Sequence, residues 1–468
     1  MKVLLTHGYF LNEDPTEQRI MKPYPPLGIL YISTYLKEHG IDNKVFDTTF
    51  SSKNEFKKYL VDEKPDYIAI YVNLMTKINV LDIIKYIKST DSIKSAKIIL
   101  GGPEVRYNAT DLLELGADFV VIGEGEETTL ELINRLEMKN AKDFKNINGI
   151  GFKDEKGKIV FNAERSLISD IDTLPVPNRN GIDIRKYQEA WKERHGMNAV
   201  SVSTMRGCPY TCRWCSRAVY GLTYRRRSPE KVVEELLQIK QEYNPDTIWF
   251  VDDVFTISHK WLAGFNEELK RKNLKIKYEC ITRADRMNEE VIETLKDSGA
   301  FRVWIGAESG SQRIIDAMDR RVKVEQVREM IQLAKKHDIE TGTFIMLGYP
   351  GETEKDIEQT ITHLKKSNPD HFTITVAYPI KGTEFYEEIE SSQLNAFDWE
   401  KHSDRDRDFI RTYSKKYYDF AVRRVVNEVR YHQKRNNGFI NTETAVLKLK
   451  SIAAKSGMLL VRKLKWIN

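Results

Sequence analysis

Short runs of apolar and β-branched residues alternate with amphipathic stretches through the first 140 residues of this chain, and this alternation constrains the fold most. The runs have the length of strands, and the stretches repeat apolar residues at three- and four-residue spacing, as helices do. Five such repeats predict an α/β domain with an open, doubly wound (Rossmann-like) parallel sheet. The predicted strands are Val3–Thr6, Lys44–Asp47, Tyr67–Val72, Lys97–Leu100 and Phe119–Ile122. The predicted helices include Leu27–His39, Val80–Ser89 and Glu126–Leu136.

Two glycine-containing loops follow the last two of these strands. They read Gly101-Gly102-Pro103 and Gly123-Glu124-Gly125-Glu126. Ligands of doubly wound sheets bind at the carboxyl ends of the strands, and glycine lets the backbone approach a flat or phosphorylated ligand closely. Both loops are therefore candidate binding loops, although ordinary turns between strand and helix have similar glycine spacing.

A second alternating series begins after a polar connector, residues 141–195. The connector contains a polar hairpin turn at Asp154–Gly157 and a stiff, proline-containing stretch at 172–178. Residues 196–390 follow, with six predicted strands, and residues 391–468 are predicted to be helical and basic. Six βα units predict a partial parallel barrel, whose chemistry gathers at the C-terminal ends of its strands. The six strands are Ala199–Thr204, Thr247–Val251, Lys275–Cys280, Arg302–Gly306, Thr341–Met346 and His371–Val376.

The composition is that of a globular protein with two or three domains. Of its 468 residues, 41% are apolar and 31% charged, which excludes collagen-like, low-complexity and wholly disordered classes. The sequence contains no run of about 18 apolar residues, so it predicts no transmembrane helix. The N-terminus, MKVLLTHGYF, lacks the features of a signal peptide and is expected to form the first buried strand of a cytoplasmic protein.

The C-terminal region is strongly basic. Residues 401–468 hold 17 Lys or Arg and 6 Asp or Glu, a net charge of +11, whereas the whole chain carries +5. Three interpretations of residues 444–467 are open: the apolar stripe packs on the barrel, it lies on an anionic membrane surface at the inner membrane face, or the region binds nucleic acid. Nucleic acid is not expected, because the region lacks clustered aromatic residues that would stack on bases. Membrane contact would favour a hydrophobic substrate. The stripe consists of Val446, Leu449, Ala453, Gly457, Leu460, Leu464 and Ile467.

Three of the four cysteines, Cys208, Cys212 and Cys215, fall within eight residues directly after the first predicted barrel strand. Soft thiolates select zinc or iron–sulfur clusters, and so few cysteines exclude a disulfide scaffold. A structural zinc site usually has four ligands, and no fourth is evident, since Cys280 lies 65 residues further on and His195 precedes the strand. Three thiolates with one open position suit a [4Fe–4S] cluster whose unique iron binds a small molecule. Zinc remains the alternative, and Cys280 is expected to be a core residue.

The CxxxCxxC run, with Trp214 before its last cysteine, resembles the motif of the radical S-adenosylmethionine (SAM) superfamily. In that family the cysteines hold a [4Fe–4S] cluster, and SAM chelates its fourth iron. Further matches follow in the family's order: Asp252 and Asp253 after the second barrel strand, Arg283 after the third, Glu308 and Ser309 at the end of the fourth, and Gly348 within the segment 342–353 of the fifth. The resemblance implies that the aspartates lie near the SAM amino group, that Glu308 contacts the ribose or amino group, and that the last segment binds adenine. Arg283 is expected to serve SAM rather than the cluster.

The N-terminal half resembles the cobalamin-binding domain that precedes the barrel in cobalamin-dependent radical SAM enzymes. The matching segments are Pro25-Pro26-Leu27-Gly28 and the two glycine loops, so the resemblance covers roughly residues 1–390. It implies that cobalamin lies between the two domains, against Gly101, Gly102 and the loop 123–126. Many cobalamin proteins bind cobalt through the His of a DxHxxG loop, which this chain lacks. His7, at the end of the first strand, is therefore not expected to coordinate cobalt.

This resemblance implies a C-methyltransferase that acts on an unactivated carbon. The reduced cluster would split one SAM into methionine and a 5′-deoxyadenosyl radical, and cobalamin would deliver a methyl group taken from a second SAM. A ring-forming, C–C coupling or oxidative radical SAM enzyme is the alternative within the family, and an iron–sulfur or cobalamin sensor is the alternative of another class. The expected partners are a substrate that the sequence does not identify and an electron donor such as flavodoxin or ferredoxin.

Overall fold

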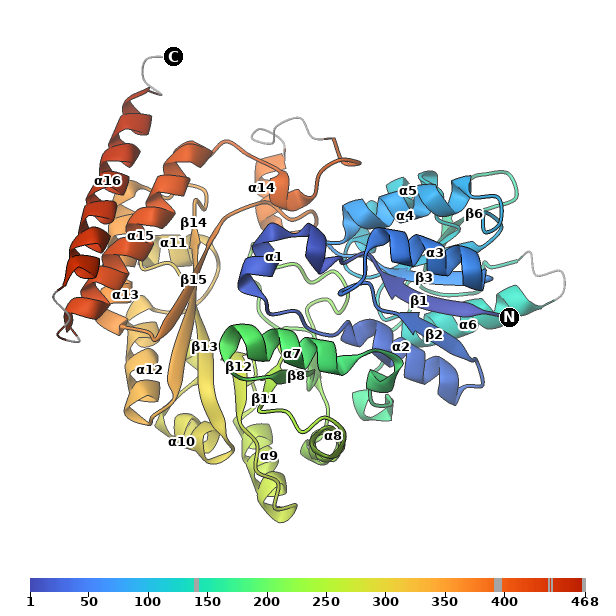
Figure 1. Ribbon diagram of the computed structural model, residues 1–468, viewed down its shortest axis with the longest axis horizontal. Helices are drawn as coiled ribbons and strands as arrows, with labels where there is room; N and C mark the ends of the chain where they lie inside the picture. The colour runs from blue at the N-terminus through green and yellow to red at the C-terminus, as the bar shows by residue number, and fades with distance from the viewer. Residues whose placement is uncertain (139–142, 391–397, 437, 439–440, 465–468) are drawn as a thin grey trace. The chain divides into compact units, whose positions relative to one another are not determined.

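The computed structural model describes the whole chain except residues 139–142, 391–397, 437, 439–440 and 465–468 (Figure 1). Among the described residues, no helix is both long enough and apolar enough to cross a membrane. The chain divides into two compact units. The first unit comprises Met1–Pro209, Ser216–Ile248 and Phe397–Asp406, and the second comprises Tyr210–Cys215, Trp249–Ala396 and Arg407–Asn468.

The first unit contains a seven-stranded sheet with the strand order β2-β1-β3-β4-β5-β6-β7. Strands β1 to β5 pair in parallel, with Leu5 opposite Val45 on one side and Ala69 on the other, whereas β6 and β7 are antiparallel. The chain runs from β1 to one side for β2 and to the other for β3, so the predicted doubly wound sheet is confirmed. The strands are β1 (Val3–His7), β2 (Asn43–Phe46), β3 (Tyr67–Tyr71), β4 (Lys97–Gly101), β5 (Phe119–Val121), β6 (Ile150–Lys153) and β7 (Ile159–Phe161).

Helices cover both faces of this sheet, because successive connections cross on opposite sides (Figure 1). Helices α2 and α6 pack on one face, where Leu36 and Leu132 meet Ile99 of β4 in one apolar cluster. Helices α3, α4 and α5 pack on the other face, in a cluster that includes Ile68 of β3 and Leu112. The helices of the first unit are α1 (Pro15–Ile20), α2 (Leu27–Glu38), α3 (Lys53–Glu63), α4 (Lys77–Ser89), α5 (Val105–Glu114), α6 (Glu126–Glu137), α7 (Ile184–His195) and α8 (Pro229–Glu242).

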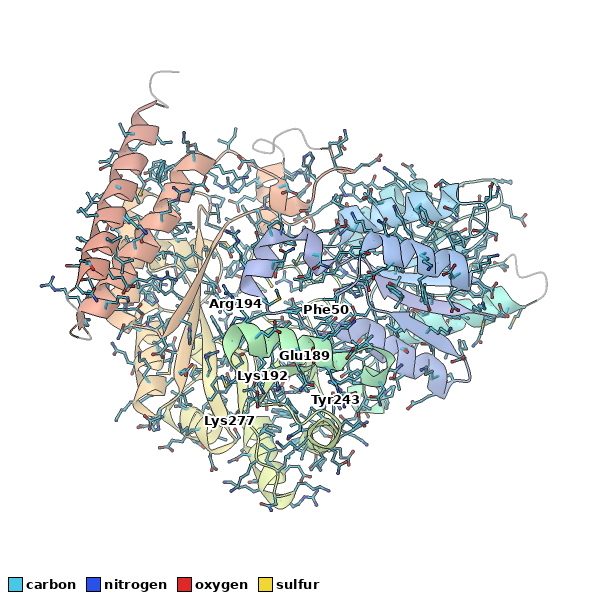
Figure 2. The ribbon with its side chains drawn as sticks, viewed as in Figure 1. Phe50, Glu189, Lys192, Arg194, Tyr243 and Lys277 are labelled. Carbon is cyan, nitrogen blue, oxygen red and sulfur yellow. The ribbon has the colours of Figure 1, made fainter. Side chains whose placement is uncertain are left out.

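Part of the predicted connector, residues 141–195, belongs to the first sheet. Strands β6 and β7 form its antiparallel edge, and the predicted polar turn joins them, with the N–H of Gly157 donating to the carbonyl of Asp154 at 2.9 Å. The connector ends in α7, which buries Tyr187 and Trp191. The exposed side chains of α7 labelled in Figure 2 are Glu189, Lys192 and Arg194.

The second sheet has six strands in the order β15-β14-β13-β12-β11-β8. Strands β12 to β15 pair in parallel with helices between them, which is the partial parallel barrel that the sequence predicts. The strands are β8 (Ala199–Val202), β11 (Thr247–Phe250), β12 (Tyr278–Thr282), β13 (Ala300–Glu308), β14 (Glu340–Leu347) and β15 (His371–Val376). The helices of the second unit are α9 (His259–Arg271), α10 (Glu289–Asp297), α11 (Gln312–Ala317), α12 (Val324–Lys336), α13 (Glu354–Ser367), α14 (Glu384–Glu390), α15 (Lys415–Asn436) and α16 (Thr442–Leu464).

The third predicted barrel strand, Lys275–Cys280, is displaced in the structure. Strand β12 begins at Tyr278, because Lys275 and Lys277 are exposed and only the residues from Tyr278 onward are buried in the sheet. The prediction began three residues too early. The correct end of the strand at Thr282 places Arg283 directly at its carboxyl end.

The C-terminal helices α15 and α16 lie side by side (Figure 1). The hydroxyl of Ser451 in α16 donates to Glu428 of α15 at 2.7 Å. Val446, Leu449 and Leu460 are exposed by 44, 66 and 64%. The interpretation in which the apolar stripe packs on the barrel is therefore wrong for these three residues. The side chain of Leu464 and the whole of Ile467 lie outside the described residues.

Candidate functional site

The three clustered cysteines lie in the loop between two short strands, β9 (Met205–Arg206) and β10 (Arg225–Arg226), which pair antiparallel. Cys212 is buried, Cys208 is half-buried and Cys215 is exposed. Among the described residues, only a group without cysteine brings three His, Cys, Asp or Glu ligand atoms within 4.8 Å of one another. Sulfurs bound to one tetrahedral zinc with Zn–S bonds of about 2.3 Å would lie about 3.8 Å apart, so the cysteines do not have the spacing of a zinc site. Cys280 is fully buried in β12, as expected of a core residue.

The second half of the cysteine loop is fixed to the second unit by backbone and side-chain contacts. The N–H of Arg213 donates to the carbonyl of Met318 at 3.2 Å, and its own carbonyl accepts from the N–H of Phe385 at 3.0 Å. The hydroxyl of Thr211 donates to Asp319. Trp214 packs against the apolar cluster that contains Met318. The aromatic residue of the motif therefore holds the loop on the core beneath it.

Arg283 contacts this loop directly and is 1% exposed. Its Nη1 lies 3.7 Å from Sγ of Cys212, its Nη2 donates to the carbonyl of Arg320 at 2.7 Å, and its Nε donates to Asp285 at 2.8 Å. The Tyr210 ring stacks on the guanidinium, 3.7 Å from Cζ. The thiolate is the form of cysteine that binds metal, and a guanidinium beside the sulfur complements its negative charge. Arg283 thus serves the cysteine loop, in addition to the SAM role that the resemblance implies.

Arg320 is a second guanidinium at the same sulfur. Its Nη1 lies 3.7 Å from Sγ of Cys212, and its Nε lies 3.8 Å from Oε1 of Glu308. In the described part of the structure this Nε is buried without a hydrogen-bond partner. Burial raises the pKa of the Glu308 carboxyl, although the charges of Arg320 and Arg283 oppose the shift.

Gly306 makes room for this arrangement at the end of β13. A Cβ at this position would lie 2.5 Å from Nη2 of Arg320 and 2.8 Å from Oε1 of Glu308. Glu308 itself has a φ of +63°, in the left-handed region that residues with a side chain rarely adopt. A non-glycine residue in that region costs about 1–3 kcal/mol and is commonly found at functional sites. The backbone is therefore shaped to present the Glu308 carboxyl next to Arg320.

The remaining residues predicted to bind SAM also follow strands of the second unit. Asp252, which is buried, and Asp253 come directly after β11. The buried Ser309 hydroxyl lies 3.3 Å from that of Thr360 and accepts from the N–H of Ser311 at 3.2 Å, so it holds its own loop. The backbone N–H of Gly348 donates to Oε2 of Glu352 at 2.6 Å. Burial raises the pKa of the Glu352 carboxyl to about 8.

These side chains fit the cluster and the SAM that the resemblance implies. Thiolates are the donors of a [4Fe–4S] cluster, and Arg283 and Arg320 place positive charge beside the sulfur of Cys212. SAM carries both an ammonium and a carboxylate. The carboxylate of Glu308 and the guanidinium of Arg320, whose Nε has no hydrogen-bond partner among the described residues, offer one group of each complementary charge.

The predicted binding loops of the first unit lie at the carboxyl ends of β4 and β5. Gly102 has a φ of +110°, and a Cβ there would lie 2.5 Å from the carbonyl oxygen of Val72. This close contact with the chain after β3 is enough to require glycine at this position, whether or not a ligand binds there. The carboxylate of Glu124 accepts hydrogen bonds from Arg206 at 2.6 Å and Arg225 at 2.7 Å and is 4% exposed. The other glycines of these loops are Gly101, Gly123 and Gly125.

His7 is buried, and protein groups use both of its ring nitrogens. Its Nε2 lies 2.9 Å from Oδ1 of Asp47, and its Nδ1 accepts from the N–H of Tyr9 at 3.1 Å and lies 3.1 Å from the Thr48 hydroxyl. Burial raises the pKa of the Asp47 carboxyl, but hydrogen bonds from His7 and its neighbours outweigh burial and hold that pKa below its usual value. His7 therefore has no nitrogen left for cobalt. The strand ends of the first unit fit a corrinoid bound without this histidine, since Arg225 keeps two buried donor nitrogens without a partner among the described residues.

Comparison with known proteins places the two units in known families. The family model described as "B12 binding domain" matches residues 19–133, and the model of the "Radical SAM superfamily" matches residues 202–364. An uncharacterised methyltransferase of Pyrococcus horikoshii, PH0819, is 31% identical over 416 residues, which cover 86% of each chain. The anaerobic magnesium-protoporphyrin IX monomethyl ester cyclase of Rubrivivax gelatinosus is 26% identical over 415 residues, covering 86% of this chain and 72% of the cyclase.

Solved structures share the fold at low sequence identity. The radical SAM methyltransferase TsrM of Kitasatospora setae, solved with its tryptophan substrate and a SAM analogue, superposes with a TM-score of 0.73 and 15% identity. The match covers 100% of this chain and 99% of TsrM. The described parts of both units therefore share their folds with this protein.

The chain belongs to the radical SAM superfamily, in the group that carries a B12-binding domain before the barrel. It is a radical SAM enzyme of methyltransferase type, and its cofactors are a [4Fe–4S] cluster, SAM and cobalamin. Where each predicted residue acts among these cofactors stays a prediction.

Sequence reasoning missed three arginines that the structure places at these sites. Arg320 follows a short helix rather than a strand, so no strand-end pattern marks it. Arg206 and Arg225 flank the cysteine loop in β9 and β10. The proximity of Arg206 to Cys208 in the sequence was the one available signal.

Proposed function

We propose that this enzyme transfers a methyl group to an unactivated carbon of its substrate. The observation that carries the proposal is the presence, in one chain, of a cysteine loop bordered by SAM-complementary charges and a B12-binding domain preceded by His7, whose two ring nitrogens contact protein groups. The most similar relative described above, at 31% identity, bears the name methyltransferase, which supports methyl transfer.

The protein's own residues bind and orient the reacting groups in this proposal. Cys208, Cys212 and Cys215 hold the cluster, Glu308 and Arg320 bind the two charged groups of SAM, and the strand ends of the first unit bind the corrinoid. When bound, the cluster with SAM supplies hydrogen abstraction from carbon, and cobalamin supplies the methyl group. The protein positions these groups and excludes water from them.

Counting the products formed from SAM tests this proposal. The anaerobically reconstituted enzyme would be incubated with a reductant and with SAM labelled in its methyl group, in separate reactions with a polar metabolite extract and a lipid extract. Methyl transfer to carbon predicts S-adenosylhomocysteine together with 5′-deoxyadenosine, and label in an extracted compound. The proposal would be contradicted if an extract increased the formation of 5′-deoxyadenosine but no S-adenosylhomocysteine appeared.

A ring-forming reaction is the second candidate, and the 26% identity to an anaerobic cyclase over most of this chain favours it. That reaction consumes SAM only as the source of the radical. It therefore yields deoxyadenosine alone, and the same product analysis separates it from methyl transfer.

The exposed apolar face of α16 supports a peripheral contact with an anionic membrane. Leu449 and Leu460 are exposed on a helix that also carries exposed Lys450 and Lys455. An amphipathic helix of this kind can rest its apolar face at the acyl boundary while its cations lie near anionic headgroups. Such a contact would favour a hydrophobic substrate and a location at the inner membrane face, and both are part of the proposal.

A further inference from the structure

A buried cluster of charged and aromatic residues lies at the carboxyl end of β5 in the first unit. It contains Glu124 and Glu126 of the second glycine loop, Arg206 of β9, Arg225 of β10, and Tyr220. The side chains of the two acids are each 4% exposed, and those of the two arginines are 8% and 11% exposed. Charged groups that are withdrawn from water need hydrogen-bond partners, so a polar atom of the cluster that lacks one is informative.

Both carboxylates and the two Nη atoms of Arg206 have hydrogen-bond partners within the protein. Oε1 of Glu124 accepts from Nη1 of Arg206 at 2.6 Å. Oε2 of Glu124 accepts from Nη1 of Arg225 and from the N–H of Ile168, each at 2.7 Å. Glu126 accepts from Nη2 of Arg206 at 2.5 Å. Burial disfavours the charged guanidinium, but these carboxylates outweigh burial and raise the pKa of Arg206. Each carboxylate oxygen of Glu124 thus already accepts a hydrogen bond from a protein group.

Only one of the three guanidinium nitrogens of Arg225 has hydrogen-bond partners among the described residues. Its Nη1 donates to Glu124 and to the carbonyl of Ile168 at 2.6 Å, and its guanidinium carbon lies 5.9 Å from the centre of the Tyr220 ring. Its Nε and Nη2 are buried and have no hydrogen-bond partner among the described residues. These two nitrogens form one edge of the planar guanidinium, an arrangement that binds two oxygen acceptors side by side. A buried donor edge of this kind indicates a ligand with oxygen acceptors.

We propose that the Nε–Nη2 edge of Arg225 binds an oxygen acceptor of cobalamin, and that Glu124 is a positioning residue that acts through Arg225. The inference rests on the proposed function, because it takes cobalamin as the ligand of the first unit. Cobalamin offers two sources of such acceptors, the amide side chains of the corrin ring and the phosphodiester of its nucleotide loop. The placement at the end of β5 agrees with the rule that ligands of doubly wound sheets bind at the carboxyl ends of the strands.

The first test is binding of hydroxocobalamin to the full-length protein carrying its reconstituted cluster, measured by equilibrium dialysis. Arg225→Lys keeps a charge that can pair with Glu124 but loses the donor edge. It is expected to weaken binding about 10- to 100-fold, the range for a lost charge-assisted hydrogen-bonded pair. Arg194→Lys, at an exposed arginine of the same unit (Figure 2), is the matched control and should bind as the wild type does. Equal binding by the Arg225→Lys and wild-type proteins would overturn the inference.

Cobinamide, which keeps the corrin amides and lacks the nucleotide phosphate, distinguishes the two sources. If Arg225→Lys weakens the binding of cobalamin and cobinamide equally, the acceptor is a corrin amide. If it weakens cobalamin alone, the acceptor is the phosphodiester. Glu124→Gln should also weaken binding, and the double variant should bind no more weakly than Arg225→Lys alone, because residues that act through one another are not additive. Additive losses would remove the positioning role of Glu124.

Hydrogen exchange of the wild-type protein keeps the inference testable if the variants fail to fold. Addition of hydroxocobalamin should slow amide exchange in the segments 123–128 and 220–227. Protection of the first segment without the second would overturn the role of Arg225. If the wild type binds no cobalamin at all, the corrinoid assignment of the proposed function fails along with the inference. Binding that is insensitive to Arg225 defeats the inference alone.

Discussion

Nη1 of Arg320 lies 3.7 Å from Sγ of Cys212, so a cationic side chain that no sequence motif marks borders a ligand of the predicted cluster. Arg283 approaches the same sulfur at the same distance from the end of β12. Two guanidiniums beside one buried sulfur complement the negative charge that thiolate ligands carry. Arg283 and Arg320 thus provide positive charge next to a predicted ligand of a thiolate-ligated centre.

The first prediction concerns the cysteines. Anaerobically reconstituted protein should hold about four iron and four sulfide, as a [4Fe–4S] cluster does. Replacing Cys208, Cys212 and Cys215 with Ala should abolish both the visible cluster absorption and the reductive cleavage of SAM. Cys280→Ser, at the buried cysteine in β12, is the control and should keep the iron. A tight stoichiometric zinc without iron would contradict the assignment.

The second prediction concerns Glu308 and Arg320. Glu308→Ala and Arg320→Met should retain iron but weaken SAM binding about tenfold or more, because each removes a charged hydrogen-bonding partner. Arg321→Met, at a neighbouring side chain that is 69% exposed, is the control and should bind SAM normally. Isothermal titration of the iron-loaded proteins measures the affinity. Unchanged SAM affinity and cleavage in Glu308→Ala would remove that residue from the site.

The fold was predictable because hydrophobic patterning acts locally. The run at 67–72 is apolar and the run at 371–376 alternates polar with apolar residues, and the structure has strands at both. The predicted start of β12 was wrong because Ile276, between two exposed lysines, produces the same polar–apolar alternation as a strand. Strand existence therefore follows from short-range pattern, whereas a strand's exact start depends on which residues the tertiary structure buries.

The sites were predictable only where a motif carries the chemistry. The spacing of the cysteines marks them, but Arg320 reaches Cys212 from 108 residues away, a contact that only the packed fold creates. Glu124 shows the converse. The glycines around it predicted a ligand contact, whereas its oxygens are taken by Arg206 and Arg225. Partners that are distant in the sequence decide whether a polar residue is free to bind, and a single sequence does not contain that information.

The third prediction concerns Glu352, whose buried carboxyl has a pKa of about 8 against an ordinary value of 4.5. The folded protein holds this proton more tightly than the unfolded chain does. The stabilisation that Glu352 contributes is therefore complete at low pH and is lost as pH rises between these values. The free energy of unfolding should decrease by up to about 1.4 kcal/mol per pH unit from about pH 5 to 8. Glu352→Gln should lack this component, as denaturant unfolding of both proteins across the pH range will show. Parallel pH profiles of the two proteins would refute the assignment.

The fourth prediction concerns His7, whose ring nitrogens are bound to protein groups. His7→Ala should leave the absorption spectrum of bound cobalamin unchanged, because the histidine is not a cobalt ligand. His7→Asn offers a second variant that keeps hydrogen-bonding capacity towards Asp47 if the alanine variant is unstable. A spectral change of the kind that accompanies loss of an axial nitrogen, in either variant, would show that His7 coordinates cobalt.

The fifth prediction concerns the exposed apolar face of α16. The intact protein should co-sediment with liposomes containing anionic lipid at low salt, and less so as salt screens the attraction between lysines and headgroups. Leu449→Ser together with Leu460→Ser should reduce binding, because these side chains are 66 and 64% exposed and provide the apolar contact. Leu222→Ser, at an exposed leucine of the first unit, is the matched control and should have no effect. If the intact protein fails to sediment at low salt, α16 does not bind membranes, and the argument for a hydrophobic substrate falls with it.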